Sequence, residues 1–71
     1  MDARTRYLIF CIETYKKKRG LTGVEVYNLF KKYGFFEYIL DFYETLHIQG
    51  TQYLLEELDE YRNYQDRKQA T

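Results

Sequence analysis

Residues 22–34 read TGVEVYNLFKKYG, and this stretch contains signals for both ends of a helix. Thr22 is followed three residues later by Glu25, which is the spacing of a capping box, where two side chains satisfy free backbone N–H groups at a helix start. Gly34 ends the apolar pattern, as a glycine closing a helix does. The face that we expect to be buried carries apolar residues at helical spacing: Val26, Leu29, Phe30 and Tyr33.

The segment before this helix predicts a first helix that begins after Asp2 as N-cap and continues to about Lys18. Gly20 ends it, and four cations at residues 16–19 lie where the helix dipole favours them. The expected core stripe is Leu8, Cys11, Ile12 and Tyr15. Phe10 lies nearly opposite this stripe at 100° per residue, so we expect another group to cover it.

The segment after Gly34 predicts a third helix, from about Phe36 to Ile48, that ends at Gly50. Two adjacent apolar stripes would place it at the centre of the molecule. The first stripe is Phe35, Ile39, Phe42 and Leu46, and the second is Phe36, Leu40, Tyr43 and His47.

A fourth helix should follow, with Thr51 as its cap and leucines at residues 54, 55 and 58 facing inward together with Tyr61. Beside that stripe lies an acidic surface with two phenols, formed by Tyr53, Glu57, Glu60 and Tyr64. The polar residues from about 66 to 71 are expected to fray. The connections are short, and no segment alternates with period two, so we predict an all-α fold, a compact bundle of about four short helices.

The chain has 71 residues, which predicts a single domain over residues 1–71 with a small core. Disulfides cannot support it, because Cys11 is alone, and one histidine cannot complete a Cys/His metal cage. Nine tyrosines and five phenylalanines provide large side chains to bury instead. Self-association would add to the buried area, and we therefore expect a homo-oligomer, most simply a homodimer.

Charge is distributed unevenly although its sum is zero. Residues 1–34 carry eight Lys or Arg against three Asp or Glu, and residues 35–71 carry three against eight. This polarity can cancel between neighbouring helices, align two copies of the chain, or present an acidic face to a basic partner. The lone cysteine favours a reducing compartment, and the apolar run at residues 7–12 is too short for a membrane span, so we expect a cytoplasmic protein.

No catalytic, cofactor or metal site is predicted. Cys11 falls on a core stripe, where a thiol behaves as a small hydrophobic group. His47 suggests a general base or a pH switch, but its place near a helix end on an aromatic stripe favours a partly buried imidazole. The carboxylate pairs have the spacing of a solvated helix face, and the chain has no glycine-rich phosphate loop or metal-binding motif. We therefore expect no enzyme activity.

Nucleic-acid binding is the alternative, because the helices on either side of Gly34 resemble a helix-turn-helix unit. The cations at Lys16–Arg19 and Lys31–Lys32 would then contact phosphates. Against this, the expected polar face of the second of these helices carries Glu37, Asp41 and Glu44, whereas a recognition helix needs groups that read base edges.

Three stretches resemble a family of short bacterial proteins of unknown function: Phe10–Tyr15, Gly23–Gly34 and Tyr43–Gly50. The resemblance covers nearly the whole chain and carries no established activity. It implies genes encoded beside small proteins similar to ADP-ribosyltransferase toxins, and hence an antitoxin or accessory subunit.

We therefore predict a protein–protein interaction module whose partner is a protein, either a toxin-like enzyme or another copy of the chain. Exposed tyrosines and phenylalanines suit this role, because they are large and rigid. The alternative is that these rings only cover the chain's own core. The candidate partner-binding residues are Phe10, His47, Tyr53, Glu57, Glu60 and Tyr64.

Overall fold

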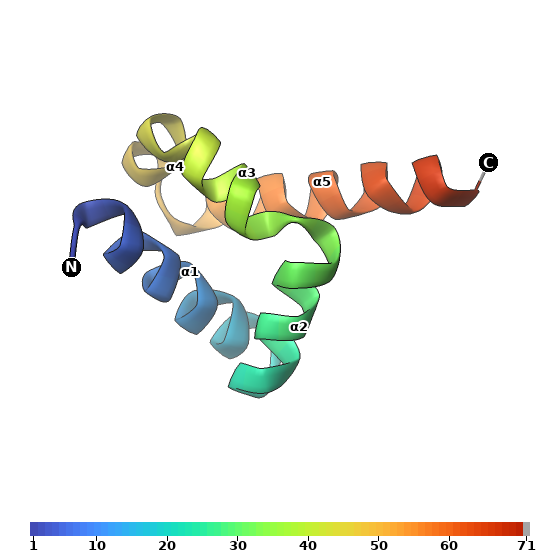
Figure 1. The fold of residues 1–71 in the computed structure, drawn as a ribbon, viewed down its shortest axis with the longest axis horizontal. Coiled ribbons are helices and arrows are strands. Elements are labelled where there is room, and N and C mark those ends of the chain that lie inside the picture. The colour runs from blue at the N-terminus through green and yellow to red at the C-terminus, as the bar shows by residue number, and fades with distance from the viewer. Residues whose placement is uncertain (71) are drawn as a thin grey trace.

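The computed structural model describes residues 1–70, and side chains through residue 69. Within that range the chain forms five helices and no strand, which confirms the predicted all-α class (Figure 1). In chain order they are α1 (Ala3–Arg19), α2 (Gly23–Tyr33), α3 (Phe35–Asp41), α4 (Tyr43–Gln49) and α5 (Thr51–Ala70).

The ends of α1 and α2 follow the local signals in the sequence. The side chain of Asp2 accepts a hydrogen bond from the backbone N–H of Thr5 at 2.8 Å. The capping box is complete, because the N–H of Glu25 donates to Thr22 Oγ1 at 3.2 Å and the N–H of Thr22 donates to Glu25 Oε1 at 2.9 Å. Gly34 has a φ of 69°, a left-handed conformation that ends α2. These predictions are confirmed.

The single helix predicted for residues 36–48 is wrong, because the chain bends at Phe42 and forms two helices of seven residues each. Phe42 has φ −109° and ψ 21°, outside helical geometry, although its N–H still donates to the Tyr38 carbonyl and its own carbonyl accepts from Leu46. The bend directs α3 toward α1 and α2, and α4 toward α5. Phe42 is 50% exposed, so its predicted place in the core is also wrong.

The bend keeps Ile39 and Leu46 in one core, since both remain buried on either side of it. A straight helix would direct both segments along one axis, and the predicted second stripe would then be covered. Instead, Leu40 and His47 are exposed, and only Phe36 and Tyr43 of that stripe are half-buried.

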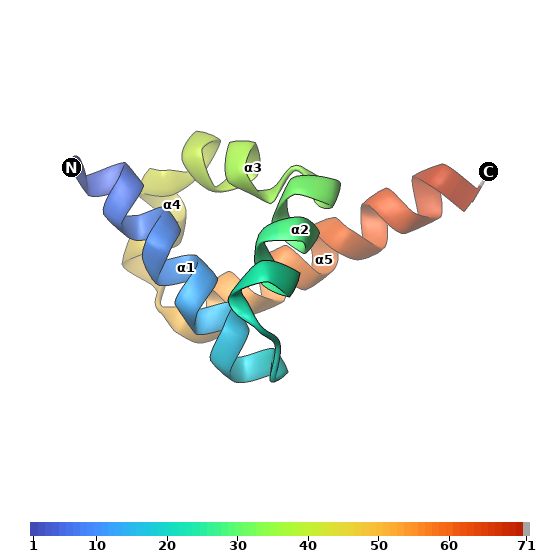
Figure 2. The same ribbon diagram turned by 60° about the horizontal axis from the view of Figure 1, so that its bottom comes forward.

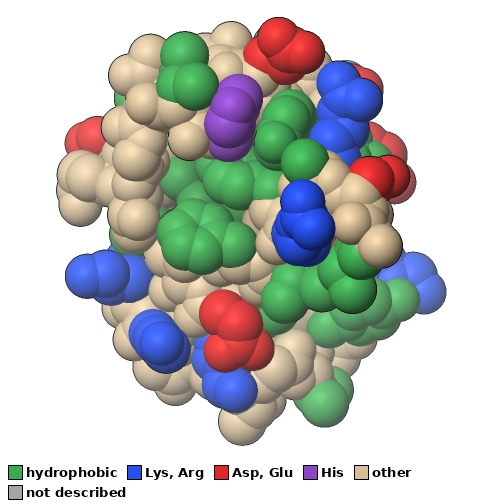
Figure 3. Space-filling view, turned by 90° about the vertical axis from the view of Figure 1, so that its left-hand side faces the viewer, with side chains coloured by type: hydrophobic (Ala, Val, Ile, Leu, Met, Phe, Trp, Pro, Cys, Tyr) green, Lys and Arg blue, Asp and Glu red, His purple; other side chains and the backbone are tan. Residues whose placement is uncertain are grey.

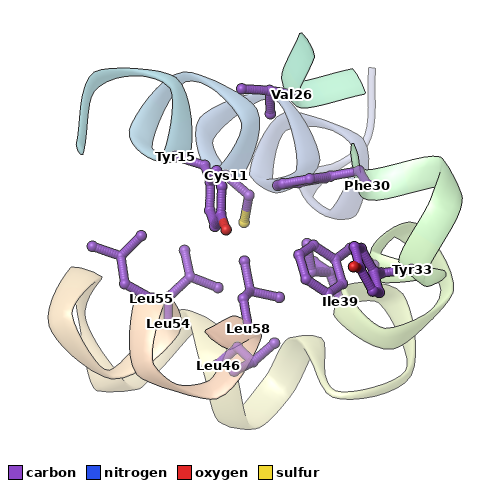
Figure 4. Packing of buried hydrophobic residues seen from close by; sticks show 11 residues of the cluster. Cys11, Tyr15, Val26, Phe30, Tyr33, Ile39, Leu46, Leu54, Leu55 and Leu58 are labelled. Atoms are coloured by element: carbon purple, nitrogen blue, oxygen red, sulfur yellow. The ribbon is translucent and has the colours of Figure 1, made fainter. Parts of the chain in front are cut away.

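The core is apolar and draws on all five helices (Figure 4). It contains no buried charged or polar residue among those described. Most of its members lie on the stripes that the sequence predicted. The buried side chains are Cys11, Tyr15, Val26, Phe30, Tyr33, Phe35, Ile39, Leu46, Leu54, Leu55 and Leu58. Around them lies a rim of half-buried apolar side chains that includes Leu8, Ile12, Leu29 and Tyr61.

The helices are arranged around this core with α5 extending past the rest of the molecule (Figures 1 and 2). The chain measures 39 × 26 × 21 Å, and the C-terminal turns of α5 account for the long dimension. The hydroxyl of Tyr33 donates to Asp66 Oδ1 at 2.8 Å and ties this part of α5 to α2. Residues 66–70 are helical, so the predicted fraying of this end stays a prediction, and Thr71 lies outside the described residues.

Candidate functional site

The predicted partner-binding residues fall on two separate surfaces. Phe10 of α1 and His47 of α4 lie on one of them, although they are far apart in the sequence. The remaining four side chains are all on α5: Tyr53, Glu57, Glu60 and Tyr64.

Two further aromatic residues connect Phe10 with His47. Tyr7 stacks on Phe10 with ring centroids 5.9 Å apart, and it meets Tyr43 at 5.5 Å and His47 at 6.4 Å in steep edge contacts. Tyr43 and His47 lie one helical turn apart, with ring centroids 4.4 Å apart and planes 2° from parallel. These four rings, Tyr7, Phe10, Tyr43 and His47, form one continuous group, which we call the aromatic face.

The aromatic face is open to solvent at its outer rings. Phe10 is 48% exposed and His47 is exposed, whereas Tyr7 and Tyr43 are half-buried beneath them. In the space-filling view, hydrophobic side chains surround the histidine on this side of the molecule (Figure 3). The prediction that Phe10 is covered holds only in part, because Tyr7 covers one side of its ring.

The orientation of the His47 ring is fixed by the backbone. Its Nδ1 lies 2.8 Å from the Tyr43 carbonyl oxygen, and since a carbonyl only accepts, Nδ1 carries the proton of this hydrogen bond. The imidazole is therefore held against Tyr43 by a stacking contact and by a hydrogen bond. This arrangement pre-organises an exposed ring.

Charged groups border the aromatic face at the α1–α4 contact. The guanidinium of Arg4 lies over the Tyr43 ring at 5.4 Å, and its Nη2 is 4.0 Å from Glu44 Oε1. The two charged side chains are 55% and 85% exposed, so this ion pair contributes little to stability.

The α5 surface is partly used by the protein's own fold. Glu57 accepts a hydrogen bond from the Tyr38 hydroxyl at 3.2 Å, and Tyr53 is half-buried against the core. Burial, followed by this bond to Glu57, raises the pKa of Tyr38 to about 12. Glu60 and Tyr64 are exposed, and they line a shallow, open depression with Asn63 and Arg67 on one face of the helix.

Sequence reasoning missed Tyr7 and Tyr43 as surface residues. Tyr43 was assigned to an apolar stripe of a helix that does not exist as one piece, and Tyr7 lies within an apolar run. A usable signal was present, because Tyr7 precedes Phe10 by three residues and Tyr43 precedes His47 by four. Rings at these spacings meet on a helix surface.

The chemistry-bearing groups are placed as follows. Cys11 is buried, and this burial raises the pKa of its thiol to about 12, so the side chain is a neutral core group at physiological pH. Among the described residues, no three His, Cys, Asp or Glu side chains gather where they could hold a metal ion. None of the helices in residues 1–70 has the length and apolar character needed to cross a membrane.

The two basic clusters lie apart. Lys16–Arg19 form the last turn of α1 and adjoin the start of α2, whereas Lys31–Lys32 are in the last turn of α2, roughly 12 Å farther along that helix. Arg19 is also engaged with Asp59 of α5. The predicted basic patch is therefore divided between the two ends of α2.

Comparison with known proteins identifies a family. The family model described as Protein of unknown function (DUF3791) matches residues 6–63, which span α2, α3 and α4 and most of α1 and α5. A search of curated proteins and a search of solved structures each gave no match. The match covers most of the chain, including the whole aromatic face, and the chain therefore belongs to this DUF3791 family of proteins of unknown function.

Proposed function

We propose that this chain is a small protein-binding module, with no catalytic role, that binds a partner protein through the aromatic face. One observation carries this proposal. Phe10 and His47, which the sequence suggested separately, come together from α1 and α4 and form one surface with Tyr7 and Tyr43.

Physical chemistry favours such a surface as an interface. Aromatic residues are over-represented among the residues that dominate binding free energy, because they bury a large area with few rotatable bonds. The rings of the aromatic face already hold one another, so little side-chain entropy is lost when a partner binds. Exposed apolar groups gathered in one place also have a cost in water that a partner removes.

The finer form of the proposal is that the chain is an accessory or antitoxin-like subunit of a cytoplasmic protein complex. It rests on the sequence resemblance of Phe10–Tyr15, Gly23–Gly34 and Tyr43–Gly50 alone. The aromatic face supplies the binding surface that such a subunit needs.

A capture experiment tests the proposal. Tagged wild-type chain and a Phe10→Asp variant are used to capture proteins from cells that encode the chain, and the bound proteins are identified by mass spectrometry. We expect a stoichiometric partner with the wild type and its loss with Phe10→Asp, because a carboxylate at the centre of the contact would be desolvated without a counter-charge.

The matched control is Tyr64→Asp on α5, which makes the same kind of change at a ring of similar exposure, 52%. Circular dichroism checks that both variants fold. If Tyr64→Asp abolishes capture and Phe10→Asp does not, the α5 surface binds the partner and the proposal for the aromatic face is wrong.

A further inference from the structure

We propose that the partner on the aromatic face is a second copy of this chain, related to the first by a two-fold axis that runs between α1 and α4. This inference rests on the proposed function, because it names the partner of the same surface.

The order of residues around α1 is the first step of the argument. At 100° per residue, Tyr7, Phe10 and Arg6 lie about 40°, 100° and 140° around the helix from the buried Cys11, all in the same direction. Tyr7 contacts α4 and is half-buried, while Phe10 and Arg6 are exposed. The outer edge of the aromatic face on α1 is therefore cationic.

The order around α4 is the opposite in charge. From the buried Leu46, Tyr43 and His47 lie about 60° and 100° around the helix, and Glu44 and Ile48 lie about 160° and 200° around it. Tyr43 and His47 contact Tyr7, whereas Glu44 and Ile48 are exposed, Ile48 by 70%. The outer edge of the aromatic face on α4 is therefore anionic and apolar.

A surface with this order is complementary to itself. In a two-fold interface each patch contacts its own image, so that a group on one side of the axis meets the group from the other side. With the axis between α1 and α4, Arg6 would face Glu44 of the partner subunit, and Phe10 would face His47 of the partner subunit. The same contacts occur twice, once on each side of the axis.

The charges needed for this pairing are available. Arg6 makes no ion pair within the described part of the chain, and Glu44 makes only the exposed 4.0 Å contact with Arg4. The whole chain has the same polarity, since its first 34 residues are net basic and the rest are net acidic by equal amounts. Two copies placed with opposite edges in register match these charges, whereas a partner of a single charge sign would match only one edge.

Charge reversal tests this contact. The oligomeric state of wild type, Arg6→Glu and Glu44→Arg is measured by sedimentation and by light scattering over a concentration series. We expect a wild-type dimer, and a weakening of at least about tenfold in each variant, because each reversal places like charges together twice.

Mixing the two variants gives the decisive result. A heterodimer of Arg6→Glu with Glu44→Arg has opposite charges at both contacts, so the mixture should regain dimers that neither variant forms alone. Native mass spectrometry of unequally labelled chains counts them. Rescue in the mixture cannot come from contacts within one chain.

The matched controls are Lys31→Glu on α2 and Glu56→Arg on α5, both exposed residues outside the aromatic face. They should leave the dimer unchanged, singly and mixed. Far-ultraviolet circular dichroism checks the fold of every variant.

The outcomes separate this inference from the proposed function. If the wild type is monomeric at about 100 μM and yet captures another protein in a Phe10-dependent way, the second copy is wrong and the binding function of the face stands. If a dimer forms but persists in Phe10→Asp and in both charge variants, the copies pair through another surface and the inference is wrong. Restored dimers in the mixture, with unaffected controls, would support it.

Discussion

At the scale of single residues, the hydroxyl of Tyr15 is the one buried side-chain polar group in the described part of the chain that lacks a hydrogen-bond partner. Its ring is 1% exposed and packs edge-on against Phe30 and Phe35. An unpaired buried hydroxyl costs free energy that its ring contacts offset. We predict that Tyr15→Phe keeps those contacts and raises the free energy of unfolding by about 1 kcal/mol.

The comparison for this substitution is Tyr38→Phe, which also removes one hydroxyl. That hydroxyl donates to Glu57, so its loss should lower the free energy of unfolding by about 1 kcal/mol. Urea titrations of both variants measure the two changes. Equal destabilisation would show that the Tyr15 hydroxyl has a partner in solution.

Two residues link stability to alkaline pH. Burial raises the pKa of the Cys11 thiol from 9.0 to about 12 and that of Tyr38 from 10.0 to about 12. The folded state therefore holds these protons more tightly than the unfolded state. Their contribution to stability is complete below pH 9 and is lost as pH rises toward 12.

We predict that the free energy of unfolding falls between pH 9 and pH 12, and that Cys11→Ala makes this fall shallower. The alanine variant is less stable at neutral pH, because it leaves a cavity, so the slope with pH is compared and not the absolute value. Urea midpoints at several pH values measure the slope. An unchanged slope in Cys11→Ala would mean that the thiol does not contribute.

At the scale of helices, the Thr22 capping box holds the start of α2. We predict that Thr22→Ala lowers the free energy of unfolding by about 1 kcal/mol, because the N–H of Glu25 loses its acceptor. Thr45→Ala is the control, since Thr45 is exposed within α4 and makes no side-chain hydrogen bond recorded among the described residues. If both variants lose the same free energy, propensity and not capping explains the change.

Helix ends with a local signal were predictable, and the bend at Phe42 was not. Asp2, Thr22 and Gly34 act on backbone groups within a few residues of themselves, so their effect is visible in the sequence. The bend has no proline or glycine at its centre. It arises because α3 and α4 pack against different helices, a tertiary cause that periodicity alone does not contain.

The candidate site shows the same division. Periodicity identified Phe10 as an apolar residue outside the core stripe, since that inference needs only one helix. That Phe10 and His47 share one surface depends on how α4 docks beside α1, which follows from the bend. The tyrosine and glutamate pattern on α5 was visible too, but the hydrogen bond from Tyr38 to Glu57 comes from another helix.

At the scale of the whole molecule, the opposite charges of the two halves meet within one fold. Both ion pairs between described residues connect the basic half to the acidic half: Arg4 with Glu44, and Arg19 with Asp59. Cancellation between neighbouring helices is thus realised in part. Most other charges remain exposed, which leaves the polarity available to a partner.

The small core makes the whole fold sensitive to single cavities. A domain of this length has a free energy of unfolding of roughly 4 to 11 kcal/mol, and Leu58 is fully buried. We predict that Leu58→Ala costs about 2 to 5 kcal/mol, enough to lower the thermal midpoint by well over 10 °C. Val24→Ala, which shortens a 71% exposed side chain, should change it by only a few degrees. Thermal unfolding followed by circular dichroism compares them.

The extension of α5 past the rest of the molecule means that one helix has two regimes of motion. Amides near the buried Leu54 and Leu58 become accessible to solvent deuterium only when the entire domain opens. Turns beyond Asp66 can unwind singly while every core contact persists. Amide exchange followed along this helix should therefore accelerate by orders of magnitude from its middle to its end, with the Tyr33 to Asp66 hydrogen bond marking the transition.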